Sequence, residues 1–252
     1  MTGTSIDGLD IAAIEIDPNE KVGFIASETT AYPFDLRKNL LALSQADAVS
    51  ISSYGELDTA LGKFIGNAVN SFLRKFGIDP KAVQAIGSHG QTIRHQPPGK
   101  SGKSEQSFTL QIGDPNQIAY ITKIITIADF RRMDIAAGGQ GAPLVPLFHQ
   151  KILKKQESGT ALVNIGGIAN ITYIEDTLLG YDIGPGNCLV DAWCQRKLDK
   201  PYDDKGHWAR TGKLNNQLLE RLLNEPYFRL EPPKSTGKEL FNLDWFERNT
   251  AC

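Results

Sequence analysis

A carboxylate followed by a glycine-rich segment is the clearest candidate for chemistry in this sequence. Asp134 lies in FRRMDIAAGGQGAPLVP (residues 130–146), which carries three glycines after the acid. The run before it, IITIADF (residues 124–130), is short and rich in β-branched residues, which predicts a buried strand. In open α/β sheets, ligands bind in loops outside the carboxyl ends of strands. Asp134 is therefore a candidate general base, although a carboxylate that caps a turn before Ala-Ala-Gly explains the same residues.

Polar residues elsewhere in the first half have the chemistry to bind a substrate. His89, Gln91 and Thr92 follow an expected strand in VQAIGSHGQT (residues 83–92) and are suited to hydrogen-bonding a sugar or an amide. A histidine that only caps its loop is the competing interpretation. Arg131 and Arg132 precede Asp134, and arginine binds carboxylates through two parallel hydrogen bonds. The same two arginines are equally typical of solvated charges beside a strand.

Two further glycine turns are candidates for binding phosphate. The first turn, at residues 3–8, offers backbone N–H groups and hydroxyls to phosphate oxygens, and Asp7 would hold Mg²⁺ through a water. A plain hairpin turn uses the same residue types. The second, around Gly166-Gly167, is explained equally well by a type I′ or II′ hairpin turn. One such turn in each half would hold a triphosphate from both sides. The residues of the two turns are Gly3, Thr4, Ser5, Ile6, Asp7, Gly8, Leu9 and Asp10, and then Asn164, Gly166, Gly167 and Asn170.

The hydrophobic pattern predicts two similar α/β halves. In the first half we expect strands at 8–17, 21–33, 83–92, 107–114 and 124–130, and helices at 36–43, 51–76, 116–123 and 144–155. In the second we expect strands within 160–176 and 177–187, and helices at 188–198 and 214–224. The boundary falls near residue 157, which gives lobes of 1–157 and 158–252. Residues 235–252 contain no recognisable closing element, so we expect further sequence beyond them.

Composition argues for a small-molecule protein. The 252 residues carry a net charge of −2, which gives no electrostatic reason to expect nucleic acid or an anionic membrane as a partner. Three cysteines are too few for a disulfide framework, and four scattered histidines argue against a histidine metal site. No apolar run approaches the ~18 residues of a membrane span, and the first ten residues do not resemble a secretory signal. We expect a cytoplasmic protein.

With these residues in view, the sequence resembles the anhydro-N-acetylmuramic acid kinases of bacterial cell-wall recycling, within the sugar kinase, Hsp70 and actin superfamily. The resemblance rests on seven segments: MTGTSIDGLD, GSHGQTIRHQP, LQIGDPNQIA, FRRMDIAAGGQGAPLVP, LVNIGGIANIT, DIGPGN and KSTGKELFNLDWF. It implies a two-lobed actin-like (ribonuclease H-like) α/β fold, with ATP and Mg²⁺ as cofactors and an amino sugar as substrate. We also consider a homodimer.

The resemblance also implies a reaction and roles for residues. Such kinases open the 1,6-anhydro bridge with water while ATP phosphorylates O6, which gives N-acetylmuramic acid 6-phosphate and ADP. Asp134 would then be the catalytic aspartate, residues 3–10 and 164–170 the phosphate loops, and His89, Gln91, Thr92 and Arg131 the substrate side.

The sequence departs from the family pattern at both ends. Members carry a strand before the first glycine loop and continue well beyond Trp245, where the adenosine pocket lies. We therefore expect a fragment or truncated gene product that does not bind ATP tightly and does not turn over alone. Two alternatives stay open: a non-catalytic remnant of this ATP-binding fold, and a kinase of the same superfamily for another sugar.

Overall fold

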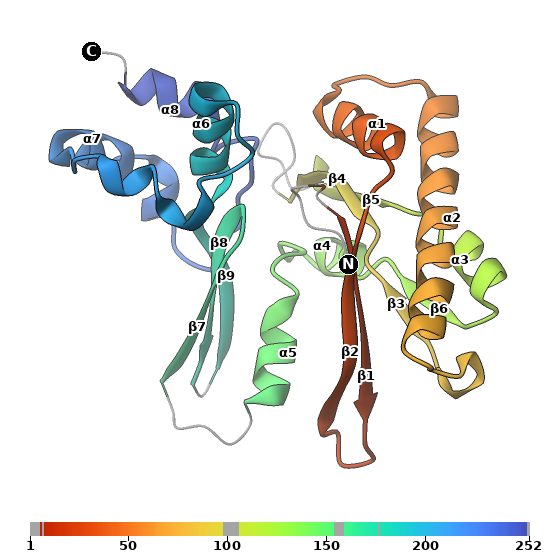
Figure 1. Cartoon of the computed structure of the whole chain (residues 1–252). Helices are drawn as coiled ribbons and strands as arrows, with labels where there is room; N and C mark the ends of the chain where they lie inside the picture. Colours follow the sequence, from red (N-terminus) through yellow and green to blue (C-terminus); the bar gives the residue numbers. More distant parts are fainter. Residues whose placement is uncertain (1–5, 7, 98–105, 154–158, 176, 251–252) are drawn as a thin grey trace. The chain divides into compact units, whose positions relative to one another are not determined.

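The computed structural model describes residues 6, 8–97, 106–153, 159–175 and 177–250. The chain forms a mixed α/β structure with two compact units, Met1–Gly141 and Ala142–Cys252 (Figure 1). The division therefore falls between Gly141 and Ala142, earlier in the sequence than the expected boundary at residue 157. Residues 142–153 belong to the second unit because α5 (Val145–Ile152) packs on the sheet of that unit.

The first unit combines short strands with one long helix. Its elements are β1 (Gly8–Ile16), β2 (Val22–Ala31), α1 (Phe34–Gln45), α2 (Ile51–Lys75), η1 (Pro80–Ala82), β3 (Ile86–Ser88), β4 (Gln91–Gln96), β5 (Phe108–Ile112), α3 (Pro115–Thr122), β6 (Thr126–Ala128) and α4 (Arg132–Ala136). The strands pair as an antiparallel β1–β2 hairpin, an antiparallel β4–β5 pair and a parallel β3–β6 pair. The parallel pair positions the candidate site, because the carboxyl ends of parallel strands lie at the same edge.

The core of the first unit is built along α2. Apolar residues that recur every three or four positions place one face of this helix in the interior, including Leu61, Ile65 and Phe72. The side chain of Ser50 caps the helix by accepting a hydrogen bond from the Ser53 N–H at 3.1 Å. Gly77 follows the helix with a φ of 65°, a conformation that favours glycine. The helix expected at residues 51–76 is therefore confirmed, with both of its ends.

The second unit is a three-stranded antiparallel sheet with helices. Its elements after α5 are β7 (Thr160–Ile165), β8 (Ile168–Ile174), β9 (Leu178–Pro185), α6 (Cys188–Leu198), η3 (Asp204–Gly206), η4 (Ala209–Thr211), α7 (Asn216–Leu223), η5 (Pro226–Arg229) and α8 (Leu243–Thr250). The sheet order is β7–β8–β9. Figure 1 shows α6, α7 and α8 gathered at one end of this sheet. Tyr227, Phe241 and Trp245 form the buried centre of this helical region.

Two helices were missed by the sequence analysis. α4 is only five residues long and carries no apolar periodicity, so residues 132–136 were expected to be part of a loop. α8 closes the described part of the second unit, where no closing element was expected. Its buried residue is Trp245, whose indole N–H donates to a Glu225 carboxylate oxygen at 2.7 Å. This long-range contact is invisible in the local pattern of the last eighteen residues.

Two glycines of α2 allow a direct test of its packing. A Cβ at Gly62 would lie 2.6 Å from the Asp114 carbonyl oxygen, whereas the space around Gly55 is open. We expect Gly62→Ala to lower the free energy of unfolding by about 1–3 kcal/mol, because the start of α3 must move away. Gly55→Ala should raise it by about 0.5–1 kcal/mol, because alanine loses less backbone entropy in a helix. Urea denaturation followed by circular dichroism measures both, and a stabilising Gly62→Ala would contradict this packing.

Candidate functional site

The parallel β3–β6 pair brings together two side chains that are distant in sequence. His89 follows β3, and Arg131 follows β6 at the N-cap of α4. The Nε of Arg131 donates a hydrogen bond to His89 Nε2 at 2.7 Å across 42 positions of sequence, and His89 Nδ1 lies 2.8 Å from the Gly90 carbonyl oxygen. Arginine can only donate, so the hydrogen-bond network assigns the imidazole proton to Nδ1, which donates to Gly90.

Burial keeps two histidines near this edge neutral. It lowers the pKa of His89 from 6.5 to about 4, with the Arg131 guanidinium as the second cause. His95, on β4, has a pKa lowered to about 4 by the same two causes in the same order. Both imidazoles are therefore uncharged at pH 7. Nε2 of His89 thus remains available to accept the hydrogen bond from Arg131.

Asp134 lies inside the short helix α4, in its first turn, with Arg131 at the N-cap position. The carboxylate does not cap that helix, and it does not lie in a loop as the sequence predicted. Asp134 Oδ2 accepts the Gly141 N–H at 2.6 Å, and its backbone carbonyl accepts the Gly139 N–H at 2.8 Å. The segment after α4 therefore folds back over an exposed carboxylate.

Local backbone geometry explains why glycine occupies three positions of this segment. A Cβ at Gly139 would overlap the Asp134 carboxylate group. Gly138 and Gly141 have φ values of 88° and 66°, which side-chain-bearing residues rarely adopt. Gly141 is also close to the Ile135 side chain, which a Cβ would approach to 3.1 Å. These three glycines let the backbone approach Asp134 closely enough for the Gly141 N–H to bind the carboxylate.

The predicted substrate-side residues are near one another, but they differ in accessibility. Gln91 is completely buried, and its amide nitrogen donates to the Thr92 carbonyl oxygen at 3.3 Å. Thr92 is half-buried, and its hydroxyl accepts from the Gln111 amide at 3.2 Å. The turn that precedes them depends on Gly90, where a Cβ would overlap the Ile112 carbonyl oxygen. The structure thus brings His89 and Arg131 into contact, whereas the Gln91 side chain faces the interior.

Half of the first predicted phosphate turn, namely Gly3, Thr4, Ser5 and Asp7, lies outside the described residues. The side chains of Ile6 and Leu9 are buried in the core of the first unit. The backbone of Ile6 has a φ of 57°, which is costly for a β-branched residue, and its carbonyl accepts from Arg37 Nε at 3.0 Å. Gly8 begins β1, and the exposed Asp10 accepts a hydrogen bond from the Thr29 hydroxyl at 2.6 Å.

The second predicted turn joins β7 to β8. Neither Gly166 nor Gly167 has a positive φ, so the turn is not of type I′ or II′, and that explanation of the two glycines fails. The Gly166 carbonyl accepts the Asn187 N–H at 2.8 Å, and the Gly167 carbonyl accepts the Gly186 N–H at 2.9 Å. The turn is thereby held to the segment that leads into α6. The flanking Asn164 and Asn170 face each other in the β7–β8 register, Asn164 exposed and Asn170 half-buried.

One buried carboxylate was not singled out from the sequence. Asp182, near the end of β9, is 7% exposed, and its Oδ2 accepts the Ser235 hydroxyl at 2.9 Å and the Thr236 N–H at 3.0 Å. Its backbone carbonyl accepts the Tyr227 hydroxyl at 2.6 Å. The segments DIGPGN and KSTGKE were recognisable as motifs in the sequence. Only the fold shows that they contact each other, through a hydrogen bond between residues 53 positions apart.

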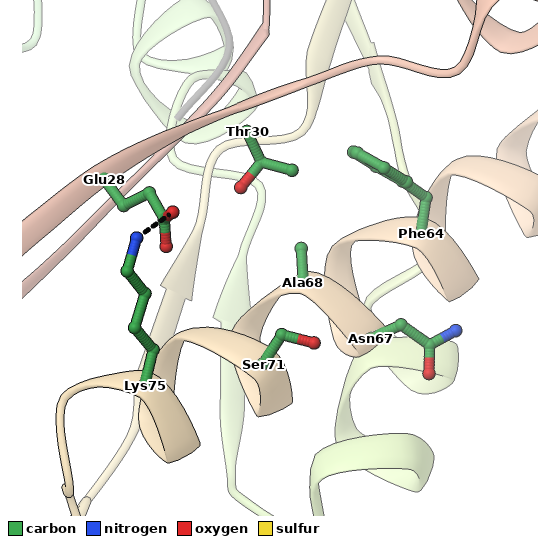
Figure 2. Close-up of a pocket in the computed structure, with 7 residues that line it drawn as sticks. All are labelled: Glu28, Thr30, Phe64, Asn67, Ala68, Ser71 and Lys75. Atoms are coloured by element: carbon green, nitrogen blue, oxygen red, sulfur yellow. Dashed lines mark hydrogen bonds and ion pairs between the residues drawn. The ribbon is translucent and has the colours of Figure 1, made fainter.

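The hollow between β2 and α2 lies apart from these residues. It has a volume of about 380 Å³, and Figure 2 shows Lys75 of α2 reaching across to Glu28 of β2, where the two make an ion pair of 2.6 Å. Phe64 and Ala68 provide its apolar part. None of the candidate site residues lines it, so shape alone would direct attention away from His89, Arg131 and Asp134.

Within the described ranges, no group of three or more His, Cys, Asp or Glu side chains is arranged to hold a metal ion. A Mg²⁺ that arrives with a nucleotide needs no such cage, because phosphate oxygens and water supply most of its ligands. None of the helices in the described ranges is long and apolar enough to cross a membrane.

The fold is mixed α/β, and the candidate site, with its polar residues and one carboxylate, lies at the ends of two parallel strands. Residues 1–252 match the family model described as anhydro-N-acetylmuramic acid kinase. The chain belongs to this family, as its sequence resemblance predicted.

Curated relatives agree with this assignment. The anhydro-N-acetylmuramic acid kinase of Coxiella burnetii (strain Dugway 5J108-111) is 51% identical over 253 residues, which cover 99% of this chain and 66% of the relative. Those of Vibrio vulnificus (strain CMCP6) and Shewanella frigidimarina (strain NCIMB 400) are each 49% identical, with 97% and 100% of this chain covered and 65% and 67% of the relatives. The chain spans about two thirds of the length of the curated relatives it matches.

Acidification should destabilise the first unit through His89 and His95. Their folded-state pKa values of about 4 lie below the unfolded value of 6.5, so the unfolded state binds more protons between these limits. The stabilisation is fully present above pH 6.5 and is lost as the pH falls toward 4. Between pH 8 and pH 5 we expect a loss of about 2 kcal/mol per histidine in the free energy of unfolding. Urea denaturation across this range measures it.

The double variant His89→Gln/His95→Gln is the control, because glutamine does not titrate. Its free energy of unfolding should depend less steeply on pH than that of the wild type in the same window. Identical pH dependences would contradict the assignment of the effect to these two imidazoles.

Proposed function

We propose that this chain carries the catalytic carboxylate and phosphate-binding residues of an ATP-dependent kinase for 1,6-anhydro-N-acetylmuramic acid, in cell-wall recycling. The observation that carries the proposal is the geometry of Asp134, an exposed carboxylate oriented by the Gly141 N–H in a family whose relatives bear this kinase name. Identity of about half the residues over nearly the whole chain favours this sugar over another substrate of the same superfamily.

Asp134 is proposed as the general base. Its carboxylate would take a proton from water as the water oxygen forms a bond to C1 of the sugar. The bond from C1 to O6 breaks at the same time, and O6 forms a bond to the γ-phosphorus of ATP, which releases ADP. The products are N-acetylmuramic acid 6-phosphate and ADP, and the proton leaves the site from Asp134. The Gly141 N–H holds one carboxylate oxygen and thereby sets the direction of the other.

The phosphates of ATP are proposed to bind at the two glycine turns. Ile6 and Leu9 have buried side chains, so residues 3–10 would bind mainly through backbone N–H groups and the hydroxyls of the turn. The backbone strain at Ile6 is of the kind that clusters at ligand-binding segments. Gly166 and Gly167 have no positive φ values, which removes the turn-type explanation, and the turn that they form is proposed as the second phosphate loop. Mg²⁺ would neutralise the phosphates, with Asp7 as an outer ligand.

The substrate side is proposed to include His89, Gln91 and Thr92, with Arg131 in contact with His89. Because the Gln91 side chain is buried, we assign it the role of holding the turn that presents His89 and Thr92. We further propose that the fold is the two-lobed, actin-like α/β fold of this superfamily, and that the protein acts on small molecules, with a homodimer as one form of assembly.

Asp134→Asn tests the proposal. It should lower kcat by about 10²–10⁴, because a neutral amide cannot take the proton of the attacking water, while ATP affinity stays unchanged. Release of ADP and mass spectrometry of the sugar product measure turnover, and calorimetry measures ATP binding. The same substitution at the matching aspartate of the C. burnetii relative gives a second measurement in a longer chain.

Two variants serve as comparisons. Asp129→Asn removes a nearby exposed acid that pairs with Arg132 at 2.7 Å, and it should leave kcat unchanged. Asp182→Asn changes the buried carboxylate of the second unit. Full kcat in Asp134→Asn together with loss of kcat in a folded Asp182→Asn would assign the general base to Asp182 and overturn the proposed role of Asp134. Absence of turnover by the wild-type chain, with turnover by the relative, would contradict activity of this chain.

A further inference from the structure

We propose that Arg131 is a positioning residue for the Asp134 carboxylate and acts through the backbone of Gly141. This inference rests on the proposed function, because it assigns the reason for which the carboxylate must be held. It differs from the sequence-based interpretation in which Arg131 binds a carboxylate of the substrate.

The two side chains hold Gly141 from both directions along the chain. The Gly141 N–H donates to Asp134 Oδ2 at 2.6 Å, and the Gly141 carbonyl accepts from Arg131 Nη1 at 2.5 Å. The N–H and the carbonyl of one residue belong to successive peptide planes, so both planes are fixed. Hydrogen bonds to a charged partner are about twice as strong as neutral ones, which makes the Gly141 backbone a firm link between guanidinium and carboxylate.

Gly141 itself is suited to this role. Gly141 is buried, and its φ of 66° is accessible to glycine but strained for residues with a Cβ. The direction of its N–H is set by that backbone conformation. Asp134 holds the peptide plane before Gly141 and Arg131 holds the plane after it. Release of the carbonyl by Arg131 would free the φ and ψ angles that join the two planes, and the hydrogen bond from the N–H to Oδ2 would loosen.

His89 anchors the guanidinium at its other side. Arg131 Nε donates to His89 Nε2 at 2.7 Å, and His89 is itself held by its hydrogen bond to Gly90. The guanidinium is planar and rigid, so Nε and Nη1 engage His89 and Gly141 at fixed angles. A lysine ammonium is a point charge on a flexible stem and cannot reproduce this pair of contacts. The chain of contacts runs from β3 through Arg131 to the Asp134 carboxylate.

Arg132 provides a matched control. It is the next residue in the sequence and carries the same charge, and its guanidinium pairs with Asp129 at 2.7 Å on an exposed surface. Within the described part of the chain, Arg132 forms no hydrogen bond or ion pair with His89, Gly141 or Asp134. Arg132→Gln therefore removes one positive charge from the same helix start and leaves the Gly141 link intact.

The test combines nuclear magnetic resonance with kinetics on the full chain. In the wild type, the Gly141 amide proton should resonate downfield and exchange slowly, because it is bound to a carboxylate. In Arg131→Gln and Arg131→Lys we expect this resonance to move upfield and exchange to increase at least tenfold, with no such change in Arg132→Gln. In these two variants kcat should fall while KM stays nearly unchanged. In Arg131→Gly, added guanidinium chloride at millimolar concentration should restore part of kcat.

The outcomes separate the two proposals. An unchanged Gly141 amide in Arg131→Gln, with a raised KM, would overturn the positioning role and make Arg131 a substrate ligand. A changed amide with unchanged kcat in an active chain would also overturn it, because the carboxylate would not depend on the link. If the matching Asp→Asn variant of the longer C. burnetii relative keeps full turnover, the proposed function fails, while the amide signals of this chain still decide whether Arg131 orients Asp134. Circular dichroism identifies variants that do not fold, and Arg131→Lys, which retains the charge, then provides the measurement.

Discussion

The parallel pairing of β3 with β6 is the constraint on which the candidate site depends. It joins Ser88 to Ala128 in register, so the residues that follow the two strands emerge at one edge. His89 and Arg131 meet there, and the second strand leads directly into α4 with Asp134. Each strand is only three residues long; α3 packs against β6, and Ile86 of β3 packs against the core to which α2 and α3 contribute. The arrangement of the candidate site is thus an outcome of one short strand pair.

The glycines acquire a different meaning once the contacts are known. In the sequence, Gly138, Gly139 and Gly141 were typical of a ligand-binding loop beside a candidate base. In the structure they bring the backbone onto the Asp134 carboxylate, and the Gly141 N–H binds it directly. A similar close approach occurs in the second unit, where a Cβ at Gly186 would overlap the Gly166 carbonyl oxygen. These glycine-rich motifs allow the backbone to pack closely against polar groups, and that packing orients the polar groups.

The second unit repeats this principle with a buried acid. Asp182 is held by donors from residues 235 and 236 and is close in space to Tyr227, so the end of β9 and the segment before α8 form one polar structure. Burying a carboxylate is costly unless its oxygens accept hydrogen bonds, and these donors meet that requirement. The chain therefore presents two differently treated acids: an exposed one in the first unit, oriented by a single backbone N–H, and an enclosed one in the second.

The sequence by itself determined the family, the long helix α2, the β7–β8 hairpin and the helix α6, because periodicity, capping residues and extended motifs are local properties. It also selected Asp134, His89 and Arg131 as residues of interest by type and position. Only the tertiary structure decided that Asp134 lies in a helix, that Gln91 is buried, that His89 accepts from Arg131, and that Asp182 meets Ser235. The helix at Asp134 is five residues long and has no apolar periodicity to reveal it, whereas the other three facts depend on contacts between residues 40 or more positions apart or on the burial such contacts create. Hydrophobic patterning indicates which face of an element is covered, and the register of strand pairs decides which side chains meet.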